Sequence, residues 1–300
     1  MEATRAVRNP QGVDIRPKPL GREQFSCSAQ ETYRLIADQL LPCLPELARC
    51  RSTAEVTAHP VYQSIRDTVA EVLGASDTGD FTREPAPPRS QYRFLAWNVE
   101  RGVQFERQLE ALRTHSYLKR CDVLLLTETD LGMVRSGNRA VALELACELG
   151  MHYAFGPCYL NLSKGAGVEQ EADGENRLGL HGNAILSRYP IRRVRMIPLK
   201  NGKDKMAGRE KRLGRQVSLL AEIEFPNYSV TAASVHLDAQ SSQRHRHDQM
   251  SDVLNGLHAD GPVVIGGDWN TMTYNSSRAL YAILGFWLRV FMGVDNVIRN

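Results

Sequence analysis

Apolar residues follow two different patterns along residues 91–300, one typical of strands and one typical of helices. Short runs rich in Val, Ile and Leu, bounded by glycine, proline or polar residues, are typical of strands because they are too short for buried helices. We expect strands of this kind within YRFLAWNVE (92–100), DVLLLTET (122–129), GNAILSRYPI (182–191), VSLLAEIEF (217–225), YSVTAASVHLD (228–238) and PVVIGGDWN (262–270). Helical spacing instead recurs around residues 105–113, 141–149 and 242–257.

The mixture of strands and helices predicts an α/β or α+β fold with packed sheets. The turn FPNY (225–228) is short enough to make a hairpin of its two flanking strands. At least part of the sheet structure is therefore antiparallel, and a purely parallel, doubly wound sheet is disfavoured.

The first ninety residues differ from the rest of the chain in composition and in the spacing of their apolar residues. Residues 1–26 carry charges and prolines and are expected to be disordered or extended. Residues 27–75 show helical spacing of Leu, Ile and Val with Pro and Gly as breaks, which predicts a short helical region. Residues 76–90 are rich in Pro, Gly and Ser and are expected to be a linker. A domain boundary is therefore predicted near Gln91.

Composition narrows the class of protein only slightly. The chain has 300 residues, 42% of them hydrophobic, and a formal net charge of +3, which is ordinary for a globular protein and too small to indicate polyanion binding. Its six cysteines show no C-x-x-C spacing, which disfavours a disulfide framework or a zinc site. No secretory signal or transmembrane span is readable, so we expect no integral membrane segment and a cytoplasmic location.

Polar side chains follow the apolar runs at four of the predicted strand ends. They are Asn98 and Glu100, Glu128, His236 and Asp238, and Asp268 and Asn270. If these ends converge, carboxylates, amides and an imidazole meet in one place. Oxygen ligands without a thiolate suit Mg²⁺ or Mn²⁺ better than zinc. We therefore expect a magnesium or manganese site.

Magnesium beside an imidazole indicates phosphoryl chemistry. The metal would neutralise phosphate charge and lower the pKa of a water molecule, while an aspartate held by an asparagine could orient that water for in-line attack. Gly266 and Gly267, just before Asp268, allow close approach of another backbone or a ligand. Taken alone, this motif favours a strand that ends in an Asx turn, and only the other strand ends shift the interpretation towards chemistry.

Five segments also carry a family resemblance: FLAWNVERG, DVLLLTETD, GNAILSRYPI, SVHLDAQ and VVIGGDWN. In order and approximate spacing, they resemble motifs of the endonuclease/exonuclease/phosphatase superfamily, and the resemblance covers residues 91–300. It implies the deoxyribonuclease-I-like fold, a four-layered sandwich of two mixed β-sheets flanked by helices. It also implies hydrolysis of phosphate esters with a divalent cation.

The resemblance assigns roles to particular residues. Asn98 and Glu128 match the metal-site positions of the family. His236 matches the imidazole that stabilises the phosphorane, Asp268 the residue that orients or activates the water, and Asn270 its partner.

The chain departs from the family pattern in two places. Thr127 stands where relatives usually have Gln before the metal glutamate, a change that should leave the carboxylate itself intact. Family members close with a strand that ends in an Asp-His pair, whereas this chain has no histidine after His258. We therefore expect the 91–300 domain to be incomplete at its C-terminus and part of a longer protein, or the last catalytic position to be absent or replaced.

Substrate-binding residues are expected in the loops. The segment LKNGKDKMAGREKRLGRQ (199–216) is rich in Lys and Arg, and it is interpreted either as a phosphate-gripping loop or as a solvated hairpin extension. Arg215 is its strongest candidate because it abuts a strand. His181 and Asn183 are expected to line the pocket, and residues 161–179 are expected to form a long loop over it.

We therefore predict a divalent-metal-dependent hydrolase of phosphate esters, with phosphodiesterase or nuclease activity favoured and nucleic acid as one substrate option. Two alternatives stay open: a lipid or inositol phosphate phosphatase, and a non-catalytic phosphate-ligand-binding domain on the same fold. At the level of single residues, Glu128 could be a solvent-facing strand end and His236 a core imidazole. The histidines of RHRH (244–247) are interpreted as a solvated helical turn rather than a metal cluster.

Overall fold

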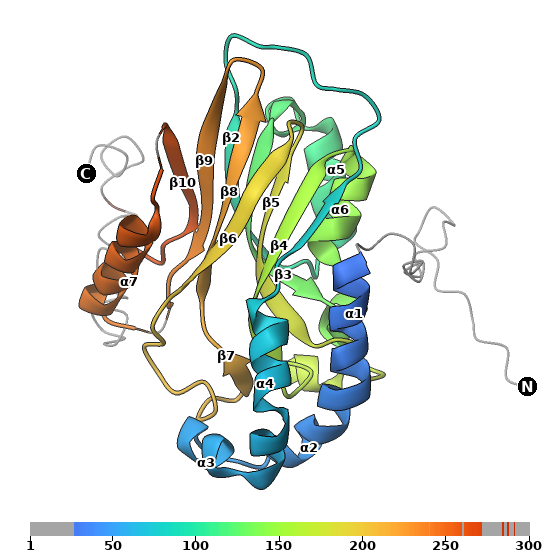
Figure 1. Cartoon of the computed structure of the whole chain (residues 1–300), viewed down its shortest axis with the longest axis vertical. Helices are drawn as coiled ribbons and strands as arrows, with labels where there is room; N and C mark the ends of the chain where they lie inside the picture. Colours follow the sequence, from blue (N-terminus) through green and yellow to red (C-terminus); the bar gives the residue numbers. More distant parts are fainter. Residues whose placement is uncertain are drawn as a thin grey trace, which may run out of the picture.

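The computed structural model describes residues 27–239, 241–259 and 261–271, together with the single residues 284, 287 and 291. Two β-sheets stand face to face in it (Figure 1). The first sheet has the order β1–β4–β5–β3–β2, and β7 pairs with β4. Its strands are β1 (Asp77–Asp80), β2 (Phe94–Arg101), β3 (Val123–Leu131), β4 (His152–Asn161), β5 (Leu180–Ser187) and β7 (Arg212–Gly214).

The second sheet has the order β10–β9–β8–β6. Its strands are β6 (Ile191–Pro198), β8 (Val217–Phe225), β9 (Tyr228–His236) and β10 (Val263–Asp268). Both sheets are mixed, because β2 runs parallel to β3 and β10 runs parallel to β9, while the other pairs are antiparallel.

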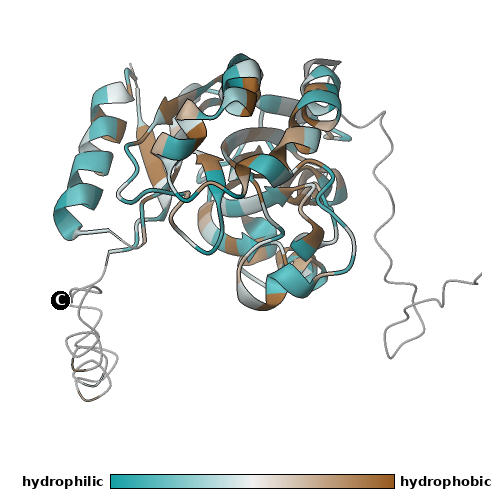
Figure 2. Cartoon of the chain, turned by 90° about the horizontal axis from the view of Figure 1, so that it is seen from below, coloured by the Kyte–Doolittle hydropathy of each residue, from teal (hydrophilic) through white to brown (hydrophobic). Residues whose placement is uncertain are grey.

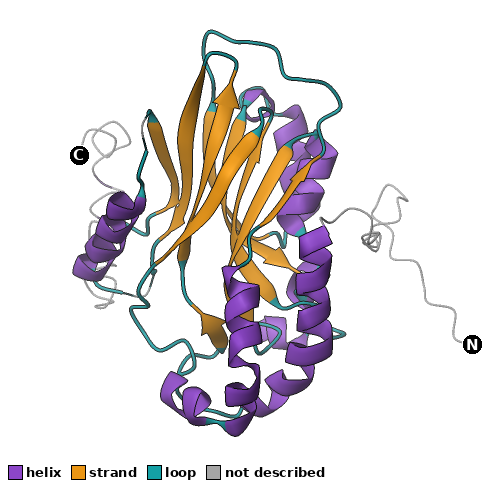
Figure 3. Cartoon of the chain, viewed as in Figure 1, coloured by secondary structure: helices purple, strands orange, loops and turns teal. Residues whose placement is uncertain are grey.

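Helices cover the outer faces of both sheets (Figure 3). The α-helices are α1 (Cys27–Leu35), α2 (Leu44–Leu47), α3 (Thr53–Ala58), α4 (Pro60–Gly74), α5 (Phe105–Thr114), α6 (Val141–Leu149) and α7 (Gln243–Gly256). Shorter helical turns are η2 (Ile36–Leu40), η3 (Leu41–Cys43), η4 (Leu118–Arg120), η5 (Val134–Ser136) and η6 (Gly167–Glu171). Of the helices named above, α7 is the one that lies beside the second sheet, and most of its residues are hydrophilic (Figure 2).

Strand β3 shows how the sequence builds these layers. Leu124 and Leu126 pack with the helices on the outer face of the first sheet, whereas Val123 and Leu125 pack against the second sheet. Successive side chains of a strand point to opposite faces, so a continuous apolar run can serve both interfaces. The predicted fold, two mixed β-sheets flanked by helices in four layers, is confirmed.

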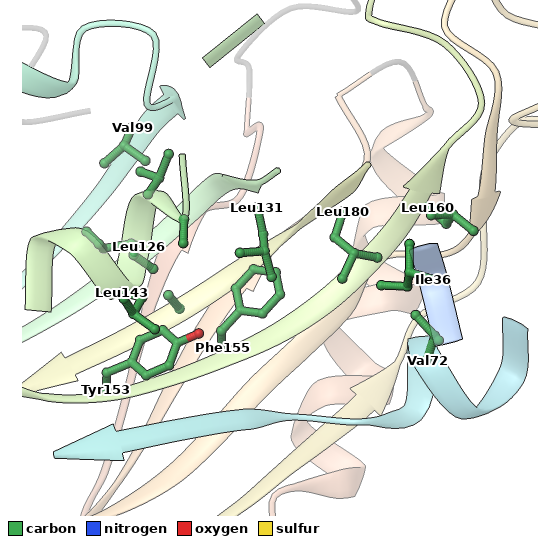
Figure 4. Close-up of a cluster of buried hydrophobic side chains, with 14 of the residues drawn as sticks. Ile36, Val72, Val99, Leu126, Leu131, Leu143, Tyr153, Phe155, Leu160 and Leu180 are labelled. Carbon is green, nitrogen blue, oxygen red and sulfur yellow. The ribbon is translucent and has the colours of Figure 1, made fainter. Parts of the chain in front are cut away.

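The helical region 27–75 shares one hydrophobic cluster with the first sheet. Ile36 and Val72 lie close to Leu160 and Leu180 in this cluster (Figure 4). The expected linker, residues 76–90, also contains β1, which pairs with β4. The prediction of a plain linker is therefore wrong at residues 77–80, and the boundary near Gln91 does not separate two cores. Residues 1–26, expected to be disordered or extended, lie outside the described residues. The same holds for most of the C-terminal part of the chain, where the domain was expected to be incomplete.

The predicted strands and helices exist with shifts of a few residues at their ends. The segment GNAILSRYPI is not one strand, because β5 ends at Ser187 and β6 begins at Ile191. Strand β4 was not predicted, since it is buried along almost its whole length and contains Gly156 and Pro157, which are poor strand residues. None of the described helices is both long and apolar enough to cross a membrane.

Candidate active site

The polar ends of four strands meet at one end of the sandwich. The Asn98 side chain on β2 donates hydrogen bonds through Nδ2 to Glu128 Oε1 on β3 (3.2 Å) and to Asp268 Oδ2 on β10 (2.9 Å). The Nε2 atom of His236, the last residue of β9, lies 3.8 Å from Glu128 Oε1 and 4.0 Å from Asp268 Oδ2. The structure thus brings together four of the five residues predicted for metal binding and catalysis, and the fifth, Asn270, contacts Asp268.

Both sheets contribute to this strand-end cluster (Asn98, Glu128, His236 and Asp268). Within each sheet the two contributing strands are parallel neighbours, so their carboxyl ends lie at the same edge. Ser234 ties the sheets together nearby, because its hydroxyl donates to the carbonyl oxygen of Leu126 at 2.8 Å. The buried interface therefore fixes the spacing of the cluster.

Glycine accounts for the close approach of β10 to the first sheet. A Cβ atom at Gly266 would lie 2.8 Å from Leu125 Cδ1 and 3.0 Å from Ala96 Cβ. Gly267 has φ 138°, a conformation that L-residues rarely adopt, and a Cβ there would collide with the backbone of Val235. These two positions bring Asp268 within reach of Asn98.

The backbone at Glu128 is also unusual. Its φ is +55°, and the pairing of β3 with β5 shifts register between Leu126 and Thr129, which marks a β-bulge. A bulge redirects a side chain that would otherwise alternate into the sheet. Positive φ in a residue other than Gly costs about 1–3 kcal/mol and is concentrated at functional sites.

Asn270 holds Asp268 in place. Its backbone N–H donates to Asp268 Oδ1 (2.9 Å), and its side-chain Nδ2 donates to the carbonyl oxygen of Leu237 (2.9 Å). The Leu237 N–H in turn donates to the Asp268 carbonyl oxygen at 2.9 Å. The Asx turn and the functional interpretation thus coexist, because the turn orients the Asp268 carboxylate.

His236 is a buried imidazole beside two carboxylates. Burial lowers the pKa of His236 below its ordinary value, although the charges of Glu128 and Asp268 act in the opposite direction. The ring is therefore neutral at neutral pH and can accept or donate a hydrogen bond at Nε2.

A second polar group lies on the neighbouring strands. Asp130 on β3, His181 on β5 and Tyr159 on β4 occupy paired cross-strand positions. His181 Nδ1 is 2.8 Å from Asp130 Oδ1, and Arg135 binds the same carboxylate through Nε (2.7 Å) and Nη2 (2.9 Å). Burial alone would raise the pKa of Asp130, but the hydrogen bonds from Arg135 and His181 outweigh it and lower the pKa. Sequence reasoning missed Asp130 and Arg135, although Asp130 stands only two residues after Glu128.

Glu128 and His236 of the strand-end cluster line a cavity of about 960 Å³, which His181 and Tyr159 also line. Five cationic side chains line it, namely Arg101, Lys203, Lys205, Arg209 and Arg212. The Arg212 guanidinium lies over the Tyr159 ring at 4.7 Å from its centroid. Lys203 and Arg209 are exposed and have no ion pair within the part of the chain that the structure describes.

The loop that carries Lys203, Lys205 and Arg209 is held by hydrogen bonds on two sides. Asp238 accepts hydrogen bonds from Lys205 Nζ (2.6 Å) and from the Gly202 N–H (2.6 Å). On the opposite side, Asp204 accepts from the Thr53 N–H (2.8 Å) and Lys211 Nζ donates to the Cys50 carbonyl oxygen (2.7 Å). The helical region therefore supports the loop.

The structure does not bring Arg215 or Asn183 to this cavity. Arg215 is exposed and is not among the lining residues, and Arg212, three positions earlier, lies there instead because β7 pairs it beside Asn161. Asn183 is buried between the sheets, where its Nδ2 donates to the Val217 carbonyl oxygen at 2.8 Å. It holds β5 against β8.

The glycine-rich loop expected over the pocket does reach it. Ala166 lines the cavity, and Glu169 forms an ion pair with Arg101 at 2.6 Å. In the RHRH segment, Ser242 caps α7 by accepting from the His245 N–H (3.1 Å), and the side chain of His247 is 80% exposed. Across the described ranges, no three His, Cys, Asp or Glu side chains are placed to hold a metal ion.

The donor set nevertheless fits a hard divalent cation that keeps several waters. Glu128 and Asp268 present carboxylate oxygens to the same amide nitrogen of Asn98. Mg²⁺ in proteins is typically held by one or two carboxylates, with the remaining positions filled by water or substrate oxygens. Glu128 is therefore a suitable protein ligand, and a cluster of three is not required. Asn98 faces Glu128 with Nδ2, and its Oδ1 accepts from the Glu100 N–H at 3.0 Å, which leaves one lone pair of Oδ1 for a cation.

Comparison with known proteins identifies the family of the chain. The sequence model of the Endonuclease/Exonuclease/phosphatase family matches residues 95–291, and the chain belongs to this family. Members of the family are generally hydrolases of phosphate esters. No curated protein sequence matches the chain.

Several solved structures are similar. An endonuclease/exonuclease/phosphatase from Beutenbergia cavernae shares 20% identity with a TM-score of 0.48, over 66% of this chain and 53% of that one. A family member from Leptotrichia buccalis shares 15% identity with a TM-score of 0.44, over 65% and 74% of the two chains. The beta toxin of Staphylococcus aureus shares 19% identity with a TM-score of 0.38, over 64% and 69%. The chain thus spans about half the length of the first of these structures.

Proposed function

We propose that this protein hydrolyses phosphate esters with the help of a divalent cation, and that phosphodiesters are better substrates than monoesters. One observation carries the proposal: Asn98, Glu128, His236 and Asp268 converge, and two of them, Glu128 and His236, line a cavity whose other wall is cationic. A nuclease is one form that such a phosphodiesterase can take.

Glu128 and Asn98 would hold Mg²⁺ or Mn²⁺ through oxygen atoms. When bound, the cation would neutralise phosphate charge and lower the pKa of a water molecule. Asp268, oriented by Asn270 and Asn98, would position the attacking water and accept its proton. The neutral His236 would donate a hydrogen bond to a phosphate oxygen, which gains negative charge as the phosphorane forms.

The cationic side chains that line the cavity would bind the rest of the substrate. This cationic wall consists of Arg101, Lys203, Lys205, Arg209 and Arg212. Lys203 and Arg209 have no internal ion pair, so they can bind a phosphate without breaking a protein contact. Arg212 presents a guanidinium held flat against Tyr159, which suits recognition of phosphate oxygens or of a planar group. A substrate with a second phosphate beyond the scissile one matches this arrangement, as in nucleic acid.

The direct test is hydrolysis of bis-(p-nitrophenyl) phosphate with Mg²⁺, with Mn²⁺, and with a chelator. We expect turnover with either cation and none with the chelator. The same assay on p-nitrophenyl phosphate, single-stranded DNA, an inositol phosphate and a phospholipid would rank the substrate classes. Binding of these ligands without any hydrolysis would overturn the proposal in favour of a non-catalytic binding domain.

A further inference from the structure

His181 lines the cavity and contacts the buried Asp130–Arg135 ion pair, and none of these three residues has a role in the chemistry described so far. We propose that His181 is a catalytic residue that donates a proton to the oxygen atom of the leaving group. This inference rests on the proposed phosphoesterase function and adds a second proton-transfer group to it.

The position of His181 is suited to this role. Only 5% of its surface is exposed, yet it lines the same cavity as Glu128 and His236. One ring nitrogen, Nδ1, is committed to Asp130. The other, Nε2, has no hydrogen-bond partner within the described part of the chain, so it is the atom available to a substrate.

The partner carboxylate fixes the protonation pattern of the ring. Asp130 is fully buried and is held by both Arg135 and the Ser136 hydroxyl (3.3 Å), so it stays ionised and immobile. A buried carboxylate at Nδ1 requires a proton on that nitrogen and orients the ring. A second proton on the ring sits on Nε2, which can donate it.

The other charges around His181 come from several elements. Glu210 pairs with Arg135 at 2.5 Å and lies within 3.7 Å of Arg212. Tyr159 on β4 stacks on the imidazole at 6.4 Å between ring centroids, and His236 faces the same cavity from β9. The negative charges of Asp130 and Glu210 are matched in number by the positive charges of Arg135 and Arg212. His181 differs from His236 in the distance to its carboxylate: Asp130 lies at hydrogen-bond distance (2.8 Å) from His181, whereas the two carboxylates beside His236 lie 3.8 and 4.0 Å away.

His236 and His181 would have different roles: His236 would stabilise the phosphorane, and His181 would protonate the leaving group. As the oxygen of the water molecule bonds to phosphorus, its proton passes to Asp268. The bond between phosphorus and the leaving oxygen breaks, and its electron pair stays on that oxygen. The leaving oxygen takes the proton from His181 Nε2 and departs as an alcohol. His181 then regains a proton from solvent, and Asp268 releases one.

Leaving-group dependence tests this assignment. Diphenyl phosphate releases phenol, which resembles the Tyr side chain with a pKa of about 10 and needs a proton, whereas p-nitrophenolate is a stable anion near neutral pH. In His181→Asn the amide can still donate to Asp130 but cannot donate at the Nε2 position. We expect kcat on diphenyl phosphate to fall about 100-fold and kcat on bis-(p-nitrophenyl) phosphate to fall less than about threefold.

Two further variants serve as a control and as an independent test. His247→Asn, at an exposed position, should change neither rate. Asp130→Asn should lower kcat on diphenyl phosphate selectively as well, but by a smaller factor, because Asp130 is a positioning residue that acts through the imidazole. If Asp130→Asn does not fold, the His181→Asn result by itself tests the proposal. Equal losses on both esters, or no loss on diphenyl phosphate, would overturn the proposal. Absence of wild-type turnover on both esters would instead refute the phosphoesterase function on which it depends.

Discussion

The strand-end cluster and the cationic wall face each other across one cavity but are built in different ways. Asn98, Glu128, His236 and Asp268 sit at the ends of four paired strands, and hydrogen bonds and the packed interface of two sheets set their spacing. The wall, in contrast, is mostly a loop between β6 and β8. Its outermost cations, Lys203 and Arg209, are exposed side chains.

This contrast separates two kinds of requirement. Reacting groups must be held to within a fraction of an ångström, which rigid strand ends achieve and loops do not. Groups that recognise the rest of the substrate tolerate more freedom, and loops can vary without disturbing the sheets. We therefore expect changes in the strand-end cluster to affect kcat and changes in the wall to affect KM.

The largest effect is expected at Glu128. Glu128→Gln keeps the shape of the side chain but removes its charge, so Mg²⁺ affinity and hydrolysis of bis-(p-nitrophenyl) phosphate should both collapse, the latter about 1,000-fold. Isothermal titration with Mg²⁺ and a thermal melt would show whether binding is lost while the fold survives. Glu71→Gln, an exposed position on α4, is the matched control. Unchanged Mg²⁺ affinity in Glu128→Gln would remove this residue from the metal site.

Asp268 and His236 should show the next largest effect. Asp268→Asn keeps the hydrogen-bonding shape but loses the base, and His236→Ala loses the donor to the phosphate. Each should lower kcat about 100-fold with a much smaller change in KM, as expected for groups that act in the chemical step. Steady-state kinetics at saturating Mg²⁺ would measure both constants. A change confined to KM would place these residues in substrate binding.

A smaller effect is expected when the wall is neutralised. The double substitution Lys203→Gln and Arg209→Gln should raise KM for a polyanionic substrate about tenfold, leave kcat nearly unchanged, and flatten the dependence of binding on salt. Arg66→Gln with Arg192→Gln, whose side chains are 60% and 61% exposed, removes the same charge elsewhere. If KM and its salt dependence stayed the same as in this control, the loop would be a solvated extension.

The smallest effect concerns Asp238, which connects the two regions. Burial alone would raise the pKa of Asp238, but hydrogen bonds from Lys205 and the Gly202 N–H outweigh it and lower the pKa in the folded state. The stabilisation is then complete above the ordinary pKa of about 3.9 and is lost as the pH falls through the lower folded-state value. Asp238→Asn should therefore reduce the free energy of unfolding by about 1 kcal/mol at pH 7.

Urea unfolding at several pH values would measure this difference. The wild type and Asp238→Asn should converge in stability as the pH falls below about 3.9. A difference that persisted unchanged at low pH would show that the Asp238 charge is not the source of the stabilisation.

The sequence by itself identified the strands that carry the strand-end cluster, because each is an apolar run that stops at a polar residue. The resemblance of five segments to one family added the four-layered sandwich of two mixed sheets. It also added the expected roles of Asn98, Glu128, His236 and Asp268. The family and the fold are confirmed. The roles of these residues in catalysis and metal binding stay predictions.

Tertiary structure alone decided three other features. Strands β1, β4 and β7 lack a clear pattern, because burial on both faces or short length removes the alternation that marks a strand. The pairing of Asp130 with His181 depends on the register between β3 and β5, which no local pattern encodes. The cavity received Arg212 rather than Arg215 because β7 pairs with β4. Local sequence sets which residues can form a strand, whereas the packing of distant strands sets which side chains meet.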